Sequence, residues 1–283
     1  MFGFQCSVKR YHTFFVSDSF LPDTVSEKEK ETRIMIITLK DGSKKEYDHA
    51  VSVLDIASDI SEGLARMACA GEADGQVVDL RTTVDHDCEL SILTFNEEGG
   101  KAAFRHTASH IMAQAIKRLY PDAKLAIGPS VSDGFYYDID LGDEVIKEED
   151  LAKIEKEMKK IAKDGKRIVR KEISKEEALE MFQNDPYKID LISDLEDGTI
   201  TCYQQGEFID LCRGPHVDTV KQLKNFKLLK HSGAYWKGDA SNKMLQRIYG
   251  ICFPTAEELE DHLHLLEEAK KRDHKKLGRE LGL

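Results

Sequence analysis

The sequence predicts an α+β protein, with a small module of short strands followed by a larger module of helices and strands. Before residue 95, short apolar runs are separated by turn residues such as Asp-Gly, as is typical of β-strands. After residue 100, longer segments carry apolar residues at helical spacing. Helices and strands do not alternate regularly, so a doubly wound sheet is not expected.

The composition indicates a globular chain of roughly two domains at about 100 to 200 residues each. The 283 residues are 41% hydrophobic and 33% charged, with a formal net charge of -11. An acidic chain of this kind can contact nucleic acid only through local basic clusters. Its six scattered cysteines favour reduced thiols and a cytoplasmic location. No apolar run approaches the roughly 18 residues of a membrane span.

The first module is expected over residues 33–96, after a disordered extension at 1–32. Residues 34–49 predict a strand, an Asp41-Gly42 turn and a second strand, because Asp-Gly supplies the positive φ angles of a tight hairpin. Ser52 is expected to cap a helix. The apolar face of that helix comprises Val53, Ile56, Ala57, Ile60 and Leu64. Strands at 76–80 and 89–94 complete a ubiquitin-like β-grasp module.

The second module is expected over residues 100–253, after a linker at 97–100. Its predicted helices cover 101–119, 148–163 and 175–183, and its predicted strands cover 134–140, 199–203 and 206–211. Thr255 and Glu258 have the spacing of a capping box and open a final charged helix within 254–283.

The helix at 101–119 carries His106 and His110 four residues apart, and hence on one face. That face lies nearly opposite the apolar stripe of Phe104, Ala108, Ile111, Ala115 and Leu119. The two imidazoles therefore either face water or line a cleft that another segment covers.

The segment FIDLCRGPH, residues 208–216, places Asp210, Cys212 and His216 where a strand-like run ends in a loop. Three imidazoles and a thiolate would be a suitable ligand set for Zn²⁺. A lone cysteine is more often a small buried hydrophobe. Thr107 stands where an HExxH metalloprotease has its general base, which counts against a protease.

Four motifs, taken together and in order, resemble the N-terminal editing region of the threonyl-tRNA synthetase family. They are RHTASHIMAQAIKRLYPDAKLAIGP, GFYYDID, FIDLCRGPHV and SGAYWKGDASNKMLQRIYG. Residues 33–95 resemble the TGS module that begins the bacterial enzymes. The resemblance runs from about residue 33 to the end of the chain.

The resemblance implies that residues 100–253 hydrolyse seryl-tRNA(Thr) made in error. In this family a class II catalytic core, which uses ATP, joins threonine to tRNA(Thr). The motifs of that core are not found in these 283 residues, so ligation is expected of a full-length parent only. The final helix would lead to that core. Dimerisation belongs to the core in this family, so the oligomeric state is not predicted.

The family's editing residues fall on seven positions of this sequence. The resemblance makes the first five of them catalytic and the last two substrate-binding: His106, Lys188, Asp210, Cys212, His216, His110 and Tyr137. We expect His106 to activate water, because neutral imidazole accepts a proton near pH 7. Lys188 would polarise the ester, and Asp210 would hold the substrate amine or tune Lys188. The other side chains would shape the pocket.

The family resemblance implies editing without a metal. Related alanine-specific editing domains hold Zn²⁺ with a similar set, so zinc at His106, His110, Cys212 and His216 is the disfavoured alternative.

Two other functions remain open. The chain could be a non-catalytic RNA-binding or regulatory module of the TGS type, although such a module needs no cluster of histidines. It could also be a zinc-dependent hydrolase of a small molecule, for which a TGS module has no use. For tRNA contact we expect a basic strip, with a solvated surface as the alternative, formed by Lys221, Lys224, Lys227 and Lys230.

Overall fold

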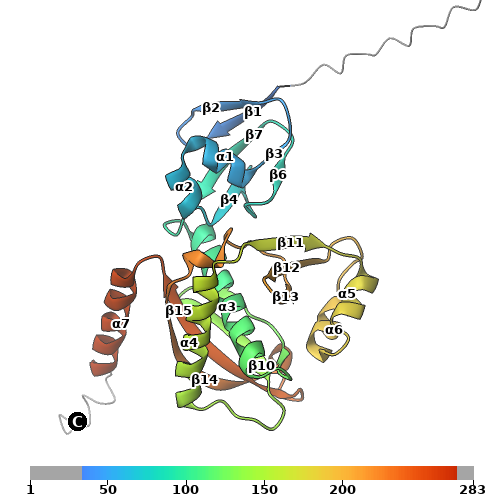
Figure 1. Cartoon of the computed structure of the whole chain (residues 1–283), viewed down its shortest axis with the longest axis vertical. Coiled ribbons are helices and arrows are strands. Elements are labelled where there is room, and N and C mark those ends of the chain that lie inside the picture. The colour runs from blue at the N-terminus through green and yellow to red at the C-terminus, as the bar shows by residue number, and fades with distance from the viewer. Residues whose placement is uncertain (1–33, 273–283) are drawn as a thin grey trace, which may run out of the picture. The chain divides into compact units, whose positions relative to one another are not determined.

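Residues 34–93 fold around a mixed five-stranded sheet in the computed structural model, which describes residues 34–272 (Figure 1). The strand order is β2-β1-β7-β4-β5, and β1 and β7 run parallel beside each other. The α+β class and the β-grasp arrangement are thus confirmed. The elements are β1 (Met35–Leu39), β2 (Lys44–Tyr47), β3 (Val51–Ser52), α1 (Val53–Ile60), α2 (Glu62–Met67), β4 (Ala70–Ala73), β5 (Gln76–Val78), β6 (Thr83–Val84) and β7 (Cys88–Leu93).

The two Asp-Gly pairs of this module form different turns. At 41–42 only Gly42 has a positive φ, and Asp41 instead accepts a hydrogen bond from the Ser43 backbone N–H at 2.9 Å. The type of turn that was expected at 41–42 is found at 74–75 instead. There Asp74 and Gly75 both have positive φ and join β4 to β5. The sequence reasoning missed this hairpin because β4 is short and rich in small residues.

The predicted helix after Ser52 is two helices in the structure. Ser52 caps α1 as expected, and its side chain accepts a hydrogen bond from the Asp55 N–H. The chain then breaks at Ser61, which is extended and caps α2 through the Leu64 N–H. A serine that can cap a new helix competes with helix continuation, so the predicted apolar face ends before Leu64.

The second module places α3 and α4 against a sheet of order β14-β15-β10-β8, and adds a three-stranded sheet, β11-β12-β13. Its elements are α3 (Glu98–Leu119), β8 (Lys124–Leu125), β9 (Ser130–Val131), β10 (Gly134–Asp140), α4 (Glu148–Asp164), β11 (Ile168–Glu172), α5 (Lys175–Met181), α6 (Pro186–Ser193), β12 (Thr201–Gln205), β13 (Phe208–Leu211), η1 (Val220–Gln222), β14 (Asn225–Tyr235), η2 (Trp236–Gly238), β15 (Met244–Phe253) and α7 (Ala256–Lys271).

The expected linker at 97–100 does not exist. Residues 98–100 form the first turn of α3, which follows β7 after only a short turn. The Glu97 side chain accepts hydrogen bonds from the Thr94 backbone N–H and hydroxyl, both at 2.9 Å. Gly100 is buried so tightly that a Cβ would lie 1.7 Å from the Thr94 carbonyl oxygen. The two glycines therefore serve close packing and give no flexibility here.

The other expected elements of the second module are found within a few residues of their predicted ends, but α6 and the long β14-β15 hairpin were not predicted. The final helix is present as α7 over Ala256–Lys271, with its Thr255 capping box. The remainder of that helix and the extension at 1–32 lie outside the described residues. Within 34–272, no helix is long and apolar enough to cross a membrane.

Candidate active site

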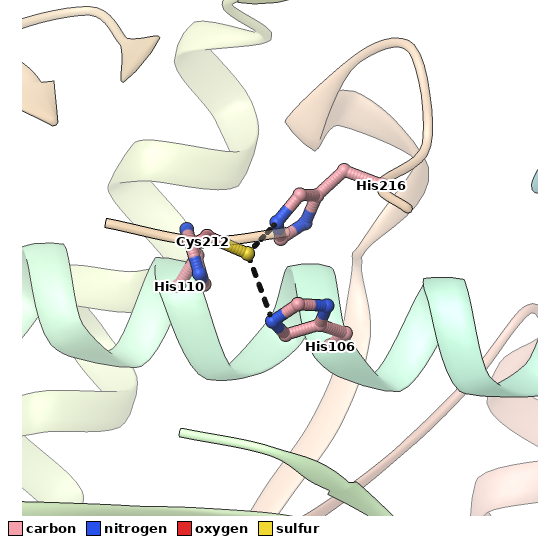
Figure 2. A group of neighbouring side chains, drawn as sticks. All are labelled: His106, His110, Cys212 and His216. Atoms are coloured by element: carbon pink, nitrogen blue, oxygen red, sulfur yellow. Dashed lines mark hydrogen bonds between the residues drawn. The ribbon is translucent and has the colours of Figure 1, made fainter. Parts of the chain in front are cut away.

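Four side chains from two segments meet beside α3 (Figure 2). His106 and His110 lie one turn apart on α3, and Cys212 and His216 belong to the loop that follows β13. The Cys212 Sγ lies 3.3 Å from the His106 Nε2 and 3.2 Å from the His216 Nε2. Of the two alternatives for the α3 histidines, the structure therefore shows the cleft covered by another segment. Leu119 of the predicted apolar stripe is 40% exposed, so the stripe ends one turn early.

Burial keeps all three imidazoles neutral. Desolvation lowers the pKa of His106 to about 4 and that of His110 to about 3, although the Asp210 carboxylate opposes both shifts. The pKa of His216 lies well below its usual value because of burial and the neighbouring imidazoles. Burial also raises the pKa of the Cys212 thiol far above its ordinary value. Near pH 7 this cluster is a set of uncharged donors and acceptors.

The Cys212 thiol lies between two imidazole nitrogens, the His106 Nε2 and the His216 Nε2, and it can donate a proton to only one of them. The Thr107 hydroxyl donates to the Ala103 carbonyl, so at His216 the Nδ1 must donate to Thr107 and the Nε2 must accept. The His106 ring also bonds the Pro215 carbonyl, which can only accept, and we assign its free lone pair to Nε2. One S–H proton cannot serve two acceptor nitrogens. One imidazole nitrogen is therefore free to act as a base.

A charged group lies beside the neutral one. The Lys188 Nζ is 2.5 Å from the Asp210 Oδ1, and the Tyr137 hydroxyl donates to the Asp210 Oδ2 at 2.5 Å. Lys188 also lies 3.3 Å from the Tyr137 oxygen, and the His110 Nε2 lies 3.8 Å from the Asp210 Oδ2. All four side chains are at most 4% exposed. The group thus links β10, β13, α3 and α6.

Opposite charge reverses the effect of burial at Asp210. Burial alone would raise its pKa, but Lys188 and the neighbouring donors lower the pKa below its ordinary value. The carboxylate in turn helps to raise the pKa of Tyr137, for which desolvation is the larger cause. Asp210 is therefore ionised, and Tyr137 is a hydrogen-bond donor.

Lys188 is delivered by α6, the helix that the sequence reasoning missed. Asp185 caps this helix by accepting from the backbone N–H groups of Tyr187 and Lys188, and Pro186 occupies its first turn. An Asp-Pro pair of this kind is a recognised start signal for a helix. It could have placed Lys188 on a helix from the sequence alone.

Six of the seven expected site residues line one cavity of about 370 Å³, and the seventh, His216, contacts Cys212 without lining the cavity. The cavity is lined by His106, His110, Cys212, Lys188 and Asp210. Its lining also includes residues 126–129, where a Cβ on Gly128 would lie 2.1 Å from the Tyr137 ring. Glycine is thus required here so that the Tyr137 ring can close the wall, a role that the sequence alone did not reveal.

The neutral cluster could hold a metal ion. One ligand atom from each of His106, His110, Cys212 and His216 lies within 4.8 Å of all the others. Three nitrogens and one sulfur suit tetrahedral zinc, and neutral imidazoles need no deprotonation to bind it. Burial raises the pKa of the Cys212 thiol in the metal-free site, so binding of zinc would have to displace the thiol proton.

The expected basic strip is spread over different elements. Lys221 lies in η1, Lys224 in the loop after it, and Lys227 and Lys230 on β14. Lys227 is paired with Glu155 at 2.9 Å, and the Lys230 ammonium lies 4.9 Å from the centre of the Tyr249 ring. Lys221 and Lys224 instead line a separate groove with Arg66 and Arg167.

Comparison with known protein families identifies both modules. Residues 35–94 match the TGS domain, and residues 200–249 match the threonyl and alanyl tRNA synthetase second additional domain. The second match includes Asp210, Cys212 and His216. The chain therefore joins a TGS domain to an editing-type domain of aminoacyl-tRNA synthetases.

The same comparison extends to whole relatives. A threonine-tRNA ligase of Clostridioides difficile is 58% identical over 250 residues, and those of Finegoldia magna and Acetivibrio thermocellus are 55% and 54% identical. Each match covers 87% of this chain and 39% of the relative. The chain is therefore similar to threonine-tRNA ligases over a TGS and editing-type region, and it spans about two fifths of the length of those relatives.

Proposed function

We propose that this chain removes serine from mischarged seryl-tRNA(Thr) by hydrolysing the ester between serine and the terminal ribose. The observation that carries the proposal is the single cavity on which neutral imidazoles and an ionised Lys188-Asp210 pair converge. A pure binding module has no use for such a buried set. The family matches supply the substrate class, since the relatives are named as threonine-tRNA ligases.

The chemistry required is modest because an aminoacyl ester is already reactive. Water adds to the ester carbonyl, its proton passes to an imidazole nitrogen, and the bond from carbon to the ribose oxygen breaks. The ribose oxygen takes the proton, which leaves free serine and tRNA. We assign the proton acceptor to the His106 Nε2, because His106 lines the cavity whereas His216, the other acceptor beside the thiol, does not.

Lys188 and Asp210 supply charge at fixed positions. The ammonium stabilises the negative charge that develops on the ester oxygen, and the carboxylate attracts the ammonium group of the bound serine. Tyr137 holds the Asp210 Oδ2 and keeps the carboxylate oriented. His110, Cys212 and His216 pack around His106 and fix its ring.

Serine lacks only a methyl group relative to threonine. A synthetic site built for threonine rejects serine weakly, because one methylene is worth about 1 to 3 kcal/mol. A second, smaller pocket corrects the error by admitting serine and excluding threonine. We assign part of this discrimination to the wall formed by Gly128 and Tyr137, where the ring packs directly against the glycine backbone.

The test is deacylation of seryl-tRNA(Thr) beside threonyl-tRNA(Thr) by the purified chain, with and without a strong chelator. We expect selective loss of serine that is unaffected by chelation. No hydrolysis by the folded chain would favour a non-catalytic TGS-type RNA-binding module. Loss of activity on chelation would favour the alternative in which His106, His110, Cys212 and His216 hold zinc.

In the full-length parent, we further propose that the same region works beside a catalytic core that joins threonine to tRNA(Thr) in the cytoplasm. The shared identity with whole threonine-tRNA ligases supports this setting.

A further inference from the structure

Two side chains of the TGS domain, Asp79 and Arg81, reach the editing-type domain and hold the backbone of His216. Both lie between β5 and β6, and their side chains are 6% and 18% exposed. They are far from His216 in sequence, and no local pattern marks them. Neither side chain lines the cavity of about 370 Å³, so any effect on hydrolysis must pass through other residues.

Arg81 donates hydrogen bonds only to carbonyl groups of the second domain and to Asp79. Its Nε donates to the Ile168 carbonyl at 2.7 Å, and its Nη2 donates to those of Val217 and Asp218 at 2.8 and 3.2 Å. Its Nη1 donates to the His216 carbonyl at 3.2 Å. A planar guanidinium can make these bonds at once, whereas the ammonium of lysine cannot reproduce the fork.

Asp79 holds the other side of the same peptide. Its Oδ2 accepts from the His216 backbone N–H at 3.0 Å and from the Tyr203 hydroxyl at 3.2 Å. The Tyr203 ring packs against the His216 ring, with the ring centres 4.6 Å apart. The Asp79 Oδ1 accepts from the Arg81 Nη1 at 2.8 Å, which fixes the two side chains to each other.

His216 is thereby held by the TGS domain at its N–H, at its C=O and, through Tyr203, at its ring. The ring in turn lies 3.2 Å from the Cys212 Sγ, which lies 3.3 Å from the His106 Nε2. A shift of the 216–218 backbone must therefore move the group that faces the proposed base. A misplacement of about 1 Å can cost on the order of 100-fold in rate.

We propose that Asp79 and Arg81 are positioning residues for ester hydrolysis, so that the TGS domain is a structural part of the editing site. This inference rests on the proposed function for its substrate. It assigns the TGS domain a role that does not require it to touch RNA.

The test compares Arg81→Gln, Arg81→Lys and Asp79→Asn in the whole chain with two controls from the same domain. Ile37→Val loosens the buried TGS core, and Lys44→Gln removes an exposed lysine of β2 that does not line the groove of Lys221 and Lys224. We expect the three clamp variants to lower kcat for seryl-tRNA(Thr) at least about tenfold, with KM changed less than about twofold, because only geometry is disturbed. Arg81→Lys should not rescue the rate.

A second readout follows the histidines directly. Long-range ¹H–¹⁵N spectra of the imidazole rings should show shifted His216 and His106 signals in Arg81→Gln, and unchanged signals in Ile37→Val. Wild-type kcat in the clamp variants, or an equal fall in Ile37→Val, would overturn the inference. If the unaltered chain does not hydrolyse seryl-tRNA(Thr), the proposed function fails, and the imidazole signals still decide whether the clamp positions His216.

Discussion

Two buried groups of polar side chains lie at one cavity. One group is neutral, and the other contains an ion pair. The group of His106, His110, Cys212 and His216 has no close cation or anion inside it, and burial makes every member neutral. The group of Lys188, Asp210 and Tyr137 contains an ion pair, which keeps the carboxylate ionised at 2% exposure. Burial alone therefore does not set protonation. The balance between desolvation and the nearest charge decides it: the Lys188 ammonium at 2.5 Å outweighs burial at Asp210, whereas the Asp210 carboxylate at 3.8 Å does not outweigh burial at His110.

The largest effect is expected from Lys188→Met, which leaves the Asp210 carboxylate buried without its partner. Removing one member of a buried ion pair typically costs about 3 to 5 kcal/mol of unfolding free energy. We expect a loss of that size in urea denaturation, together with loss of seryl-tRNA(Thr) hydrolysis. Adding Asp210→Asn should recover most of the stability and none of the activity. An unchanged urea midpoint in Lys188→Met would show that the pair is not buried as described.

His106→Gln should break the neutral group's chemistry with little effect on folding. Glutamine keeps a polar side chain of similar reach but cannot serve as the base. Losing a general base lowers rates by about 10² to 10⁴-fold. His231→Gln on β14 is the matched control, because this histidine is exposed and does not line the cavity. Equal rates in both variants would remove His106 from the proposed role.

The neutral group and the ion pair should also affect the free energy of unfolding in different pH ranges. Histidines whose pKa is lowered in the folded state are neutral there, while the unfolded chain takes up protons below pH 6.5. The free energy of unfolding should therefore fall as pH drops from about 6.5 to about 4, by at most about 1.4 kcal/mol per pH unit for each buried histidine.

Asp210 has a lowered pKa, so its contribution persists above the ordinary aspartate value of 3.8 and is lost only at lower pH. Urea denaturation at several pH values, with chelator present, measures the slope. His110→Gln should flatten the slope above pH 4. A slope that is unchanged in this variant would contradict the neutral assignment of His110.

The smallest effect is expected from Cys212→Ser. Its thiol is neutral and donates one proton between two imidazoles, and a hydroxyl can do the same. We expect hydrolysis to fall less than about tenfold and to stay insensitive to chelation. Complete loss of activity together with bound zinc in the unaltered chain would instead show that the sulfur is a metal ligand.

The sequence predicted those parts of the fold that depend on local patterns. The strong helical spacing of α3 and the caps at Ser52 and Thr255 were read correctly, because a cap and its helix are within a few residues of each other. The β14-β15 hairpin was missed for two reasons. Lysine, histidine and glycine break the alternation in β14, and Gln246, Arg247 and Gly250 interrupt the apolar residues of β15. The Ser61 break was missed because two good helix signals overlap there.

For the site, one helix face could not distinguish a solvated histidine pair from a covered cleft. The answer depends on β12 and β13, which carry the Cys212 loop across α3. The assignment of Lys188 and Tyr137 to the site came from family resemblance, and their placement depends on contacts across 51 and 73 residues of sequence. The Asp79 contact with His216 spans 137 residues, and no local sequence pattern near either residue predicts it.

The close packing of Gly100 against Thr94 at the start of α3 also has a consequence for inserting residues or exchanging domains at this point. Because only residues 94–97 separate β7 from the helix that carries His106, and Gly100 packs against Thr94, an insertion at 97–100 would change the phase of α3 relative to the strand before it. Each added residue would rotate the helix by about 100°, and the two histidines would no longer meet the Cys212 loop. The Glu-Glu-Gly-Gly stretch, which reads as a permissive splice point, is thus a place where gene fusions and domain exchanges should fail.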